Sequence, residues 1–374
     1  MGVYERLGVR KYINALATVT VYGGSIMPPE VLEAMSEASR SFVSIAELQR
    51  KAGDRLAELT NNEAAMVSCG AASGMVLAAA VAIAGDDAEL KSRLPNSEGM
   101  RNEILVCKKG RVGYDSAIRS GGGVIVEYGS AEGATEADLE AAITDRTAAL
   151  FAFHFSGMER AMKGQLPVSV QAGIAHRRGV PLIIDAAAQI PVKENLWRYT
   201  REWGADLAIF SGGKGLRGPQ ASGLVVGKRE FIDRMVAHAC PNGGVGRPMK
   251  VGKEEIAGLL RAVELYMESD EPAIIEGYER DVKAVIGAFA GVKGAVASRD
   301  FPSEAGQAMP RARIRLRTGE VKPADVAQWL REGEPGVLIA TDEDSLLVNP
   351  QTLEAGELEI VIRRLLEAAD HFNL

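Results

Sequence analysis

A lysine stands among glycines directly after an apolar run, in the stretch LAIFSGGKGLRGP at residues 207–219. Ser211 ends the apolar run, and Lys214 completes a Ser-x-x-Lys pattern. A lysine that is partly withdrawn from water has a lowered pKa, so its neutral amine can attack a carbonyl group. The glycines would let the backbone approach a flat or anionic ligand. The plainer alternative is a flexible turn whose lysine points into water.

A strand-end carboxylate precedes this lysine in the chain. Asp185 closes the apolar run PLIID, and a carboxylate at such a place needs a partner. It could cap the N-terminus of the segment that follows, which is a common role for aspartate. It could also be the counter-ion of a buried cation such as the pyridinium nitrogen of pyridoxal phosphate (PLP), whose protonated ring is an electron sink. The spacing to Lys214 leaves room for one helix and one strand, which would place both residues at the same edge of a sheet.

A turn of small residues, SCGAASG at 68–74, lies between an expected strand and an expected helix. Amide groups at a helix N-terminus, with the helix dipole behind them, bind phosphate. Close packing is the other explanation for small residues at such a turn. No GKS or GKT follows, and there is no GxGxxG with a downstream acidic residue, so a Walker loop and a nicotinamide dinucleotide fold are disfavoured. A phosphate turn, a strand-end aspartate and a Ser-x-x-Lys, in this order, are typical of a fold-type I PLP enzyme.

The elements that must position these residues alternate between strands and helices. Seven short runs rich in Val, Ile and Leu predict a sheet that helices cover on both faces. The expected strands are 64–69, 103–107, 123–128, 148–153, 181–185, 206–210 and 222–227. The expected helices lie at about 72–84, 135–144, 166–178, 194–203 and 229–239.

The chain is expected to have three parts. These are an N-terminal arm and helix at 1–58, a large PLP-binding α/β domain at 59–250 and a small C-terminal α+β domain at 251–374. The arm is expected to be irregular to residue 25, and a helix to run from Pro28 and Pro29 to about residue 58. In the small domain the pattern predicts helices at 254–270 and about 356–371, an edge or half-exposed strand at 311–317, and strands at 337–340 and 346–349.

The composition restricts the kinds of partner. Of 374 residues 47% are hydrophobic, which is ample for a large core, and the net charge of −7 argues against a general nucleic-acid or membrane-surface binder. No window reaches the length of about 18 consecutive apolar residues that a membrane span needs. The three cysteines are widely spaced without a CxxC pair, so we expect reduced thiols in a cytoplasmic protein and no zinc site.

The segment FSGGKGLRGPQASGLVVGK (210–228) resembles the cofactor-lysine segment of the selenocysteine synthase-like branch of PLP enzymes, and the likeness extends over nearly the whole chain. Within that branch, YINALATVTVYGGSIM (12–27), IIDAAAQIP (183–191) and GRPMKVGKEE (246–255) look most like the D-glucosaminate-6-phosphate ammonia-lyase group. The resemblance implies an aspartate aminotransferase-like fold with a mostly parallel seven-stranded sheet. It also implies a PLP-dependent lyase. Such an enzyme converts a hydroxylated amino acid, of the D-glucosaminate type or its 6-phosphate, by α,β-elimination into a 2-keto-3-deoxy acid and ammonia.

Other reactions use the same lysine and stay open at this point. They are selenium or sulfur transfer, transamination, aldol cleavage and racemisation of a small amino acid. A PLP-binding regulator or a cofactor-free relic is a further alternative, against which stand the intact Lys214 and Asp185 and the lack of a basic helix-turn-helix before the core. Bacterial selenocysteine synthases carry an extra N-terminal domain for seryl-tRNA, whereas this chain begins about where the catalytic core does. Together with the acidic charge, this argues against a tRNA substrate.

The resemblance also implies roles for individual residues. Lys214 matches the lysine that bonds to the cofactor, and Asp185 matches the pyridinium partner. The phosphate site and further cofactor contacts are assigned to Ser211, Gly70, Ala71, Ala72, Ser73 and Gln189. Arg247 and Lys250 would hold an anionic amino-acid substrate across the interface of a homodimer or a multiple of dimers, although a lysine cannot clamp a carboxylate with two bonds. The alternative for this pair is a surface loop with solvated charges.

Two ring-bearing side chains complete the set of candidates. His154, in FAFHFSG, could lie over the pyridine ring or contact its hydroxyl group. Tyr114, in GRVGYDSAI, could stack on the ring. For each of them a packing role in the core stays open. The histidines show no HExxH spacing, so no metal site is expected.

Overall fold

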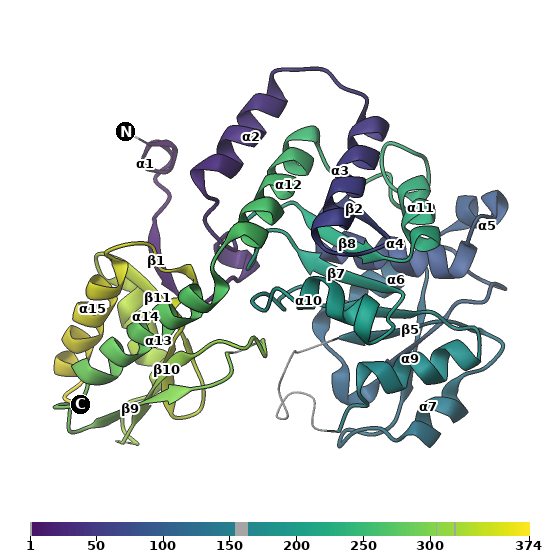
Figure 1. Ribbon diagram of the computed structural model, residues 1–374. Coiled ribbons are helices and arrows are strands. Elements are labelled where there is room, and N and C mark those ends of the chain that lie inside the picture. The colour runs from purple at the N-terminus through teal and green to yellow at the C-terminus, as the bar shows by residue number, and fades with distance from the viewer. Residues whose placement is uncertain (1, 154–163, 304, 318) are drawn as a thin grey trace. The chain divides into compact units, whose positions relative to one another are not determined.

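The computed structural model describes residues 2–153, 164–303, 305–317 and 319–374 (Figure 1). The chain divides into two compact units. The larger unit comprises Ser25–Ser269 and Ala305–Gln307, and the smaller unit comprises Met1–Gly24, Asp270–Glu304 and Ala308–Leu374. These divisions differ from the expected boundaries at 58/59 and 250/251, because the helices next to those boundaries pack together within the larger unit.

A seven-stranded sheet, in the order β2-β8-β7-β6-β5-β3-β4, forms the centre of the larger unit. β8 is antiparallel to both of its neighbours, and the other neighbouring pairs are parallel. The strands are β2 (Ala64–Ser68), β3 (Glu103–Cys107), β4 (Val124–Tyr128), β5 (Thr147–Phe153), β6 (Leu182–Asp185), β7 (Leu207–Ser211) and β8 (Gly223–Gly227). They confirm the prediction of a mostly parallel seven-stranded sheet.

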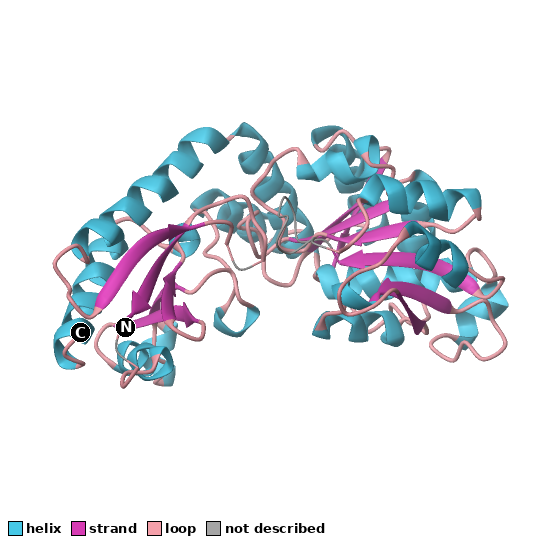
Figure 2. Cartoon of the chain, turned by 90° about the horizontal axis from the view of Figure 1, so that it is seen from below, coloured by secondary structure: helices cyan, strands magenta, loops and turns pink. Residues whose placement is uncertain are grey.

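Helices cover both faces of this sheet (Figure 2), because alternate strand residues enter two separate cores. Val67 and Ile184 belong to one core, whereas their neighbours Met66 and Ile183 belong to the other. The first core is closed by α3 (Ile45–Leu59), α7 (Glu136–Ala142), α9 (Val168–Arg177) and α12 (Lys253–Glu268). The second is closed by α4 (Ala71–Ala84), α6 (Ser116–Ser120) and α11 (Arg229–His238). Burial on both faces explains why the strands are continuous apolar runs in the sequence.

The helix expected at 28–58 consists of two helices, α2 (Pro29–Ser39) and α3. Ser44 begins the second one, because its side chain accepts a hydrogen bond from the amide of Glu47. The prediction of a single helix is therefore wrong, since it overlooks this internal N-cap. The shorter helical elements are α1 (Val3–Leu7), α5 (Ala88–Arg93), α10 (Asn195–Trp197), η1 (Thr20–Tyr22), η2 (Lys108–Gly110), η3 (Gly113–Asp115), η4 (Arg198–Glu202) and η5 (Pro350–Thr352).

The smaller unit has a five-stranded sheet in the order β1-β11-β12-β10-β9. β1 (Tyr12–Ala15) pairs in parallel with β11 (Gly336–Thr341), so the expectation of an irregular arm is wrong. Four residues are too few to show a clear alternation in the sequence. β10 (Arg311–Leu316) has the expected alternating burial but lies between β12 (Ser345–Val348) and β9 (Ala295–Asp300), and is therefore not an edge strand. The helices α13 (Glu271–Ala288), α14 (Pro323–Glu332) and α15 (Glu357–His371) share its core.

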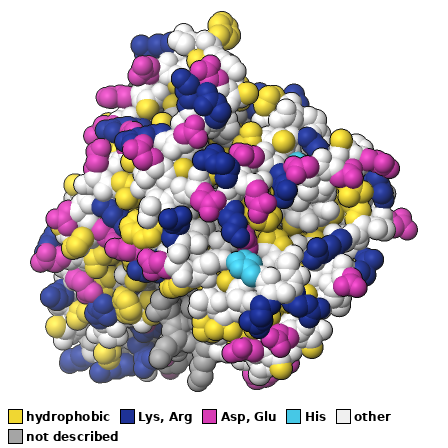
Figure 3. Space-filling model, turned by 45° about the vertical axis from the view of Figure 1, so that its right-hand side comes forward, with side chains coloured by type: hydrophobic (Ala, Val, Ile, Leu, Met, Phe, Trp, Pro, Cys, Tyr) yellow, Lys and Arg dark blue, Asp and Glu magenta, His cyan; other side chains and the backbone are white. Residues whose placement is uncertain are grey.

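The surface of the protein carries charged side chains of both signs (Figure 3). Basic and acidic side chains are interspersed over much of the face drawn in Figure 3. Within the ranges that the structure describes, no helix combines the length and the apolar character that a membrane crossing requires. Among the same residues, no group of three or more His, Cys, Asp or Glu side chains is placed to hold a metal ion.

Candidate active site

Asp185 and Ser211 leave the large sheet at the same edge. They end the adjacent parallel strands β6 and β7, in which Asp185 is paired with Ile209. The pairing continues past the strand, since the amide of Ser211 donates to the carbonyl of Ala187 at 3.2 Å. Lys214 follows on the turn after Ser211. The carboxyl ends of parallel strands are where α/β sheets bind ligands.

The carboxyl group of Asp185 is buried and lies within the electrostatic influence of Lys214. The side chain is 9% exposed, and its Oδ1 accepts a hydrogen bond from the amide of Ala187 at 2.9 Å. Burial raises the pKa of Asp185, and the positive charge of Lys214 acts in the opposite direction. No α-helix starts at Asp185, because the next one begins at Asn195 with Glu194 as its N-cap. The helix-cap alternative is thus excluded, and a cation beside the carboxylate would offset the cost of its burial.

The turn that carries Lys214 is closed and tightly packed. The amide of Gly212 donates to the carbonyl of Ser222 at 2.9 Å, and that of Gly218 donates to Gly212 at 2.8 Å. A Cβ atom on Gly213 would stand 2.5 Å from the Cα atom of Gln220, so only glycine fits. Lys214 itself is half-buried. These contacts exclude the alternative of a flexible turn with a solvated lysine.

The small-residue turn at 70–73 forms the N-terminus of α4 beside the start of β8. Gly70 is the N-cap residue, with φ at 93°, and no side chain caps this helix. The amides of its first turn, Ala71 to Ser73, have no partner within the helix. Gly223, which pairs with Ser211 in the sheet, lies against this turn, since a Cβ on Gly223 would be 2.6 Å from the carbonyl carbon of Gly70. The structure therefore brings the expected phosphate turn and Ser211 together.

Gln189, Tyr114 and His154 are the remaining candidates for contacts with the cofactor. The buried Gln189 directs its side-chain amide to the carbonyl of Ala305, at 2.9 Å. Tyr114 lies in η3, after β3, and is 67% exposed. His154 lies outside the described residues. That residues 305–307 join the larger unit could not be predicted from the sequence, because their neighbours in the chain belong to the smaller unit.

Arg247 and Lys250 are both exposed and stand on a loop that is attached away from the strand ends. Gly246 packs on Leu77 of α4, and Nε2 of His238 lies 3.3 Å from the carbonyl of Gly85, where α4 ends. Nη1 of Arg247 is 3.6 Å from Sγ of Cys240. The loop thus follows the half of α4 that is distant from Gly70. Within the described residues, Arg247 contacts Cys240 of its own loop.

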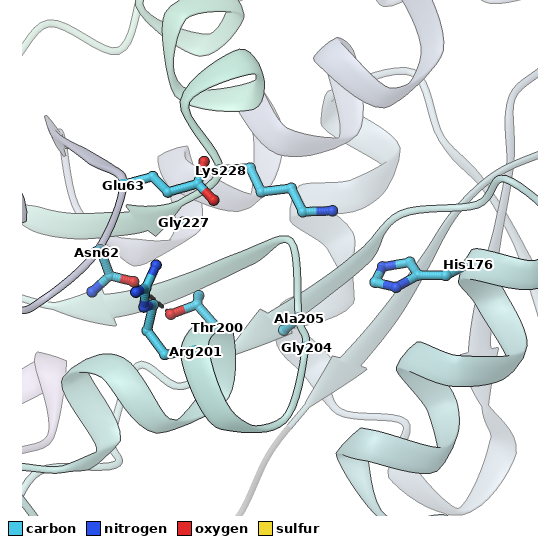
Figure 4. Close-up of a pocket in the computed structure, with 9 residues that line it drawn as sticks. All are labelled: Asn62, Glu63, His176, Thr200, Arg201, Gly204, Ala205, Gly227 and Lys228. Carbon is cyan, nitrogen blue, oxygen red and sulfur yellow. Dashed lines mark hydrogen bonds between the residues drawn. The ribbon is translucent and has the colours of Figure 1, made fainter.

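A pocket of about 180 Å³ opens at the opposite edge of the sheet (Figure 4). His176 enters it from α9, and Lys228 enters it from the residue after β8 (Figure 4). Both contact the buried carboxylate of Asp206, at 2.9 Å and 2.5 Å, and the amide of Leu182 donates to the same carboxylate at 2.7 Å. Because Lys228 compensates the charge of the buried carboxylate and His176 and Leu182 hydrogen-bond to it, we assign this group a structural role.

The chain is similar to known proteins over most of its length. The family model of SelA, L-seryl-tRNA selenium transferase, matches residues 13–275. D-glucosaminate-6-phosphate ammonia lyase of Salmonella typhimurium is 33% identical over 99% of this chain and 98% of its own length. A 5'-C-glycyluridine monooxygenase-decarboxylase of a Streptomyces species is 32% identical over 97% of this chain and 91% of its own length.

Solved structures show the same fold. The structure of a D-glucosaminate-6-phosphate ammonia-lyase superposes with a TM-score of 0.85 at 33% identity, over 99% of both chains. A serine palmitoyltransferase of S. paucimobilis, solved with PLP bound, shares the fold at 14% identity, with a TM-score of 0.60 over 97% of this chain and 88% of that one. These likenesses confirm the expected fold-type I architecture. The chain belongs to the SelA family.

Proposed function

We propose that the chain is a PLP-dependent ammonia-lyase that acts on a hydroxylated amino acid of the D-glucosaminate type. One observation carries the proposal: the phosphate turn at 70–73, Asp185 and Lys214 lie at one edge of one sheet. The relative that is an ammonia lyase, 33% identical over nearly the full length, supports this choice among PLP reactions.

The residues of this edge fit the three polar ends of the cofactor. Ser211 and the uncapped amides of Ala71 to Ser73 would hold the phosphate. Asp185 would hold the ring nitrogen, because a buried carboxylate with a raised pKa is stabilised by a cationic partner. Lys214 would bond to the carbonyl carbon. When bound, PLP supplies an electron sink for the charge that develops at the α-carbon of the substrate.

Lys214 is the proposed general base. Its neutral amine would take the α-proton of the substrate. The hydroxyl group on the β-carbon then leaves with a proton as water, and a later addition of water releases the nitrogen as ammonia. The balance is one 2-keto-3-deoxy acid and one ammonia for each amino acid. An ionised Asp185 beside the ring nitrogen would keep that nitrogen protonated.

The substrate's anionic groups would be held by a second copy of the chain, in a homodimer or a multiple of dimers. Arg247 and Lys250 are exposed, and their loop is attached away from the strand ends that hold Lys214. Elsewhere in the larger unit, between α2 and α3, two apolar side chains are exposed: Phe42 is fully exposed and Val43 is 50% exposed. Association through such a surface would supply the pair in trans. A cytoplasmic location fits the unpaired cysteines.

The test is an absorption spectrum of the purified protein and of Lys214→Ala, each before and after addition of D-glucosaminate 6-phosphate. We expect the wild type to show a visible band from lysine-bound PLP, and Lys214→Ala to lack this lysine-linked band. The wild type should also form keto acid and ammonia in equal amounts from the substrate. If the band is present but D-glucosaminate 6-phosphate is not converted, the assignment of PLP as the cofactor stands and the proposed substrate class is overturned. Turnover of a 5'-C-glycyluridine instead would favour the reaction named for the Streptomyces relative. The lack of a band after incubation with PLP would overturn the whole proposal.

A further inference from the structure

Two buried glutamines connect the turn after Asp185 with residues 305–307. Nε2 of Gln189 donates to the carbonyl of Ala305 at 2.9 Å. Nε2 of Gln307 reaches the carbonyl of Ile190 in a longer hydrogen bond of 3.5 Å. Each glutamine is 1% exposed. The two amides thus cross, each donating to the backbone of the other segment, and we name this arrangement the glutamine clasp.

The clasp is in contact with the turn of the proposed catalytic lysine. Gly215, the residue after Lys214, lies against Ile190, since a Cβ on Gly215 would stand 2.6 Å from the carbonyl oxygen of Ile190. That oxygen is the acceptor of Gln307. Ile190 therefore touches the lysine turn on one side and the clasp on the other.

The clasp also belongs to the same short segment as Asp185. The amide of Gln189 donates to the carbonyl of Ala186 at 2.9 Å, and Nδ2 of Asn195 donates to the carbonyl of Gln189 at 2.8 Å. Hydrogen bonds in a buried, weakly polar environment are strong, and a lost partner there is costly. The segment that begins with Asp185 and supports Lys214 is thus fixed in one position.

We propose that Gln189 and Gln307 are positioning residues, which act through Ile190 to fix Lys214 relative to Asp185. The proposal rests on the proposed function, and it gives Gln189 a role through the protein backbone in place of the cofactor contact that the resemblance implied. Residues 305–307 become part of the proposed active site by this route. A clasp that only stabilised the fold would leave the geometry of Lys214 unchanged when it is weakened.

Gln189→Met and Gln307→Met remove the donors with little change of shape, and Gln328→Met is the matched control. Gln328 is exposed on α14 and donates to Glu332 at 2.8 Å, far along the chain from the lysine turn. The first measurement is hydrogen–deuterium exchange of the apoprotein, followed in the peptides around 186–191 and 212–216. In these peptides we expect faster exchange in both clasp variants and the wild-type exchange rate in the control.

The second measurement uses the PLP-loaded protein. The visible band should titrate at a shifted pH in both clasp variants, and kcat for D-glucosaminate 6-phosphate should fall about 3- to 10-fold, the range of one lost buried hydrogen bond, while KM changes less. In Gln307→Glu, acidification should protonate the side-chain carboxyl group, which can then donate a hydrogen bond to the carbonyl of Ile190. The wild-type band should return under these conditions. If Gln189→Met does not fold, Gln307→Met, which loses the longer bond, carries the test.

Two results would overturn the proposal. One is unchanged exchange at 186–191 and 212–216 in the clasp variants. The other is an unchanged band titration and kcat together with a lower melting temperature, which would leave the clasp as a purely structural contact. A wild-type protein that binds no PLP would instead defeat the proposed function, and the exchange experiment on the apoprotein would still decide whether the clasp fixes the lysine turn.

Discussion

Gly223 lies directly against Ala71: a Cβ atom on Gly223 would stand 2.8 Å from the amide nitrogen with which α4 begins. Gly223→Ala must therefore move the backbone of the helix N-terminus, which the proposed phosphate site needs in place. Overpacking of this kind costs about 1–3 kcal/mol. We expect the dissociation constant for PLP to rise about tenfold or more, measured by titration of the apoprotein.

Gly287→Ala is the control for that experiment. Gly287 lies in α13, and a Cβ there would meet no atom within 4 Å. This variant should bind PLP normally and be more stable by about 0.5–1 kcal/mol, since alanine favours a helix over glycine. Wild-type affinity in Gly223→Ala would show that the α4 N-terminus does not bind the phosphate.

Asp185→Asn should stabilise the apoprotein and impair the loaded enzyme. Burial raises the pKa of Asp185 above its ordinary value of 3.8. A group whose folded pKa is raised contributes stability at low pH, and this contribution is lost as the pH rises through the folded pKa. Ionisation of Asp185 as the pH rises is therefore costly where Lys214 only partly compensates the charge, and asparagine should relieve about 1–3 kcal/mol at neutral pH.

Thermal melts of both proteins between pH 4 and pH 8 check this, with and without PLP. The apo variant should exceed the wild type at neutral pH and lose its advantage towards acid. With PLP the order should reverse, and kcat should fall about 100-fold or more, because the ring nitrogen is no longer kept protonated. An apo variant that is less stable than the wild type at neutral pH would show that Lys214 compensates the buried carboxyl group of Asp185 fully without a cofactor.

The sequence predicts the large sheet well and the N-terminal region poorly. The inner strands of the large sheet are buried on both faces, so each is visible as a continuous apolar run, and the edge strand β4 is apolar enough in sequence to be found although it is only partly buried. β1 has only four residues and gains its stability from pairing with β11, which lies more than three hundred residues later. α2 ends at Ser39 and α3 begins after its cap residue Ser44, and no proline or glycine marks the break between them in the sequence.

The sequence predicts those site residues that stand at or just after the end of an apolar strand. Asp185, Ser211 and Lys214 each follow directly from an apolar strand, so their common edge can be inferred from the strand pattern. The partner of Gln189 could not be inferred, because Ala305 follows a strand of the smaller unit and carries no side-chain signal. The placement of Arg247 depends on how a loop packs on α4, and local sequence does not determine that.

Asp206→Asn should destabilise the protein without slowing the reaction. Asp206 lies at the sheet edge opposite Lys214, and its carboxylate contacts Lys228 and His176. Because both partners are partly exposed, we expect a loss of about 1–3 kcal/mol, measured by urea unfolding. Glu140→Gln, which breaks an exposed pair with Arg177 on the neighbouring helix α9, should cost less than about 0.5 kcal/mol. A fall in kcat for Asp206→Asn at full PLP loading would give the pocket of Figure 4 a role in the reaction.

Subunit mixing tests whether Arg247 acts on the site of a second copy. Lys214→Ala and Arg247→Ala homodimers should each be inactive, the first for lack of the base and the second for lack of the substrate's anion site. After unfolding and refolding together, half of the dimers are mixed, and each of these has one site with both residues. Activity should therefore return to roughly a quarter of the wild-type value. If Arg247 served the site of its own chain, both sites of every mixed dimer would lack one residue, and no activity would return. A double variant, with Lys214→Ala and Arg247→Ala in one chain, is then mixed with wild type as the reverse test. In the trans arrangement such mixed dimers are inactive, and in the cis arrangement they keep one working site.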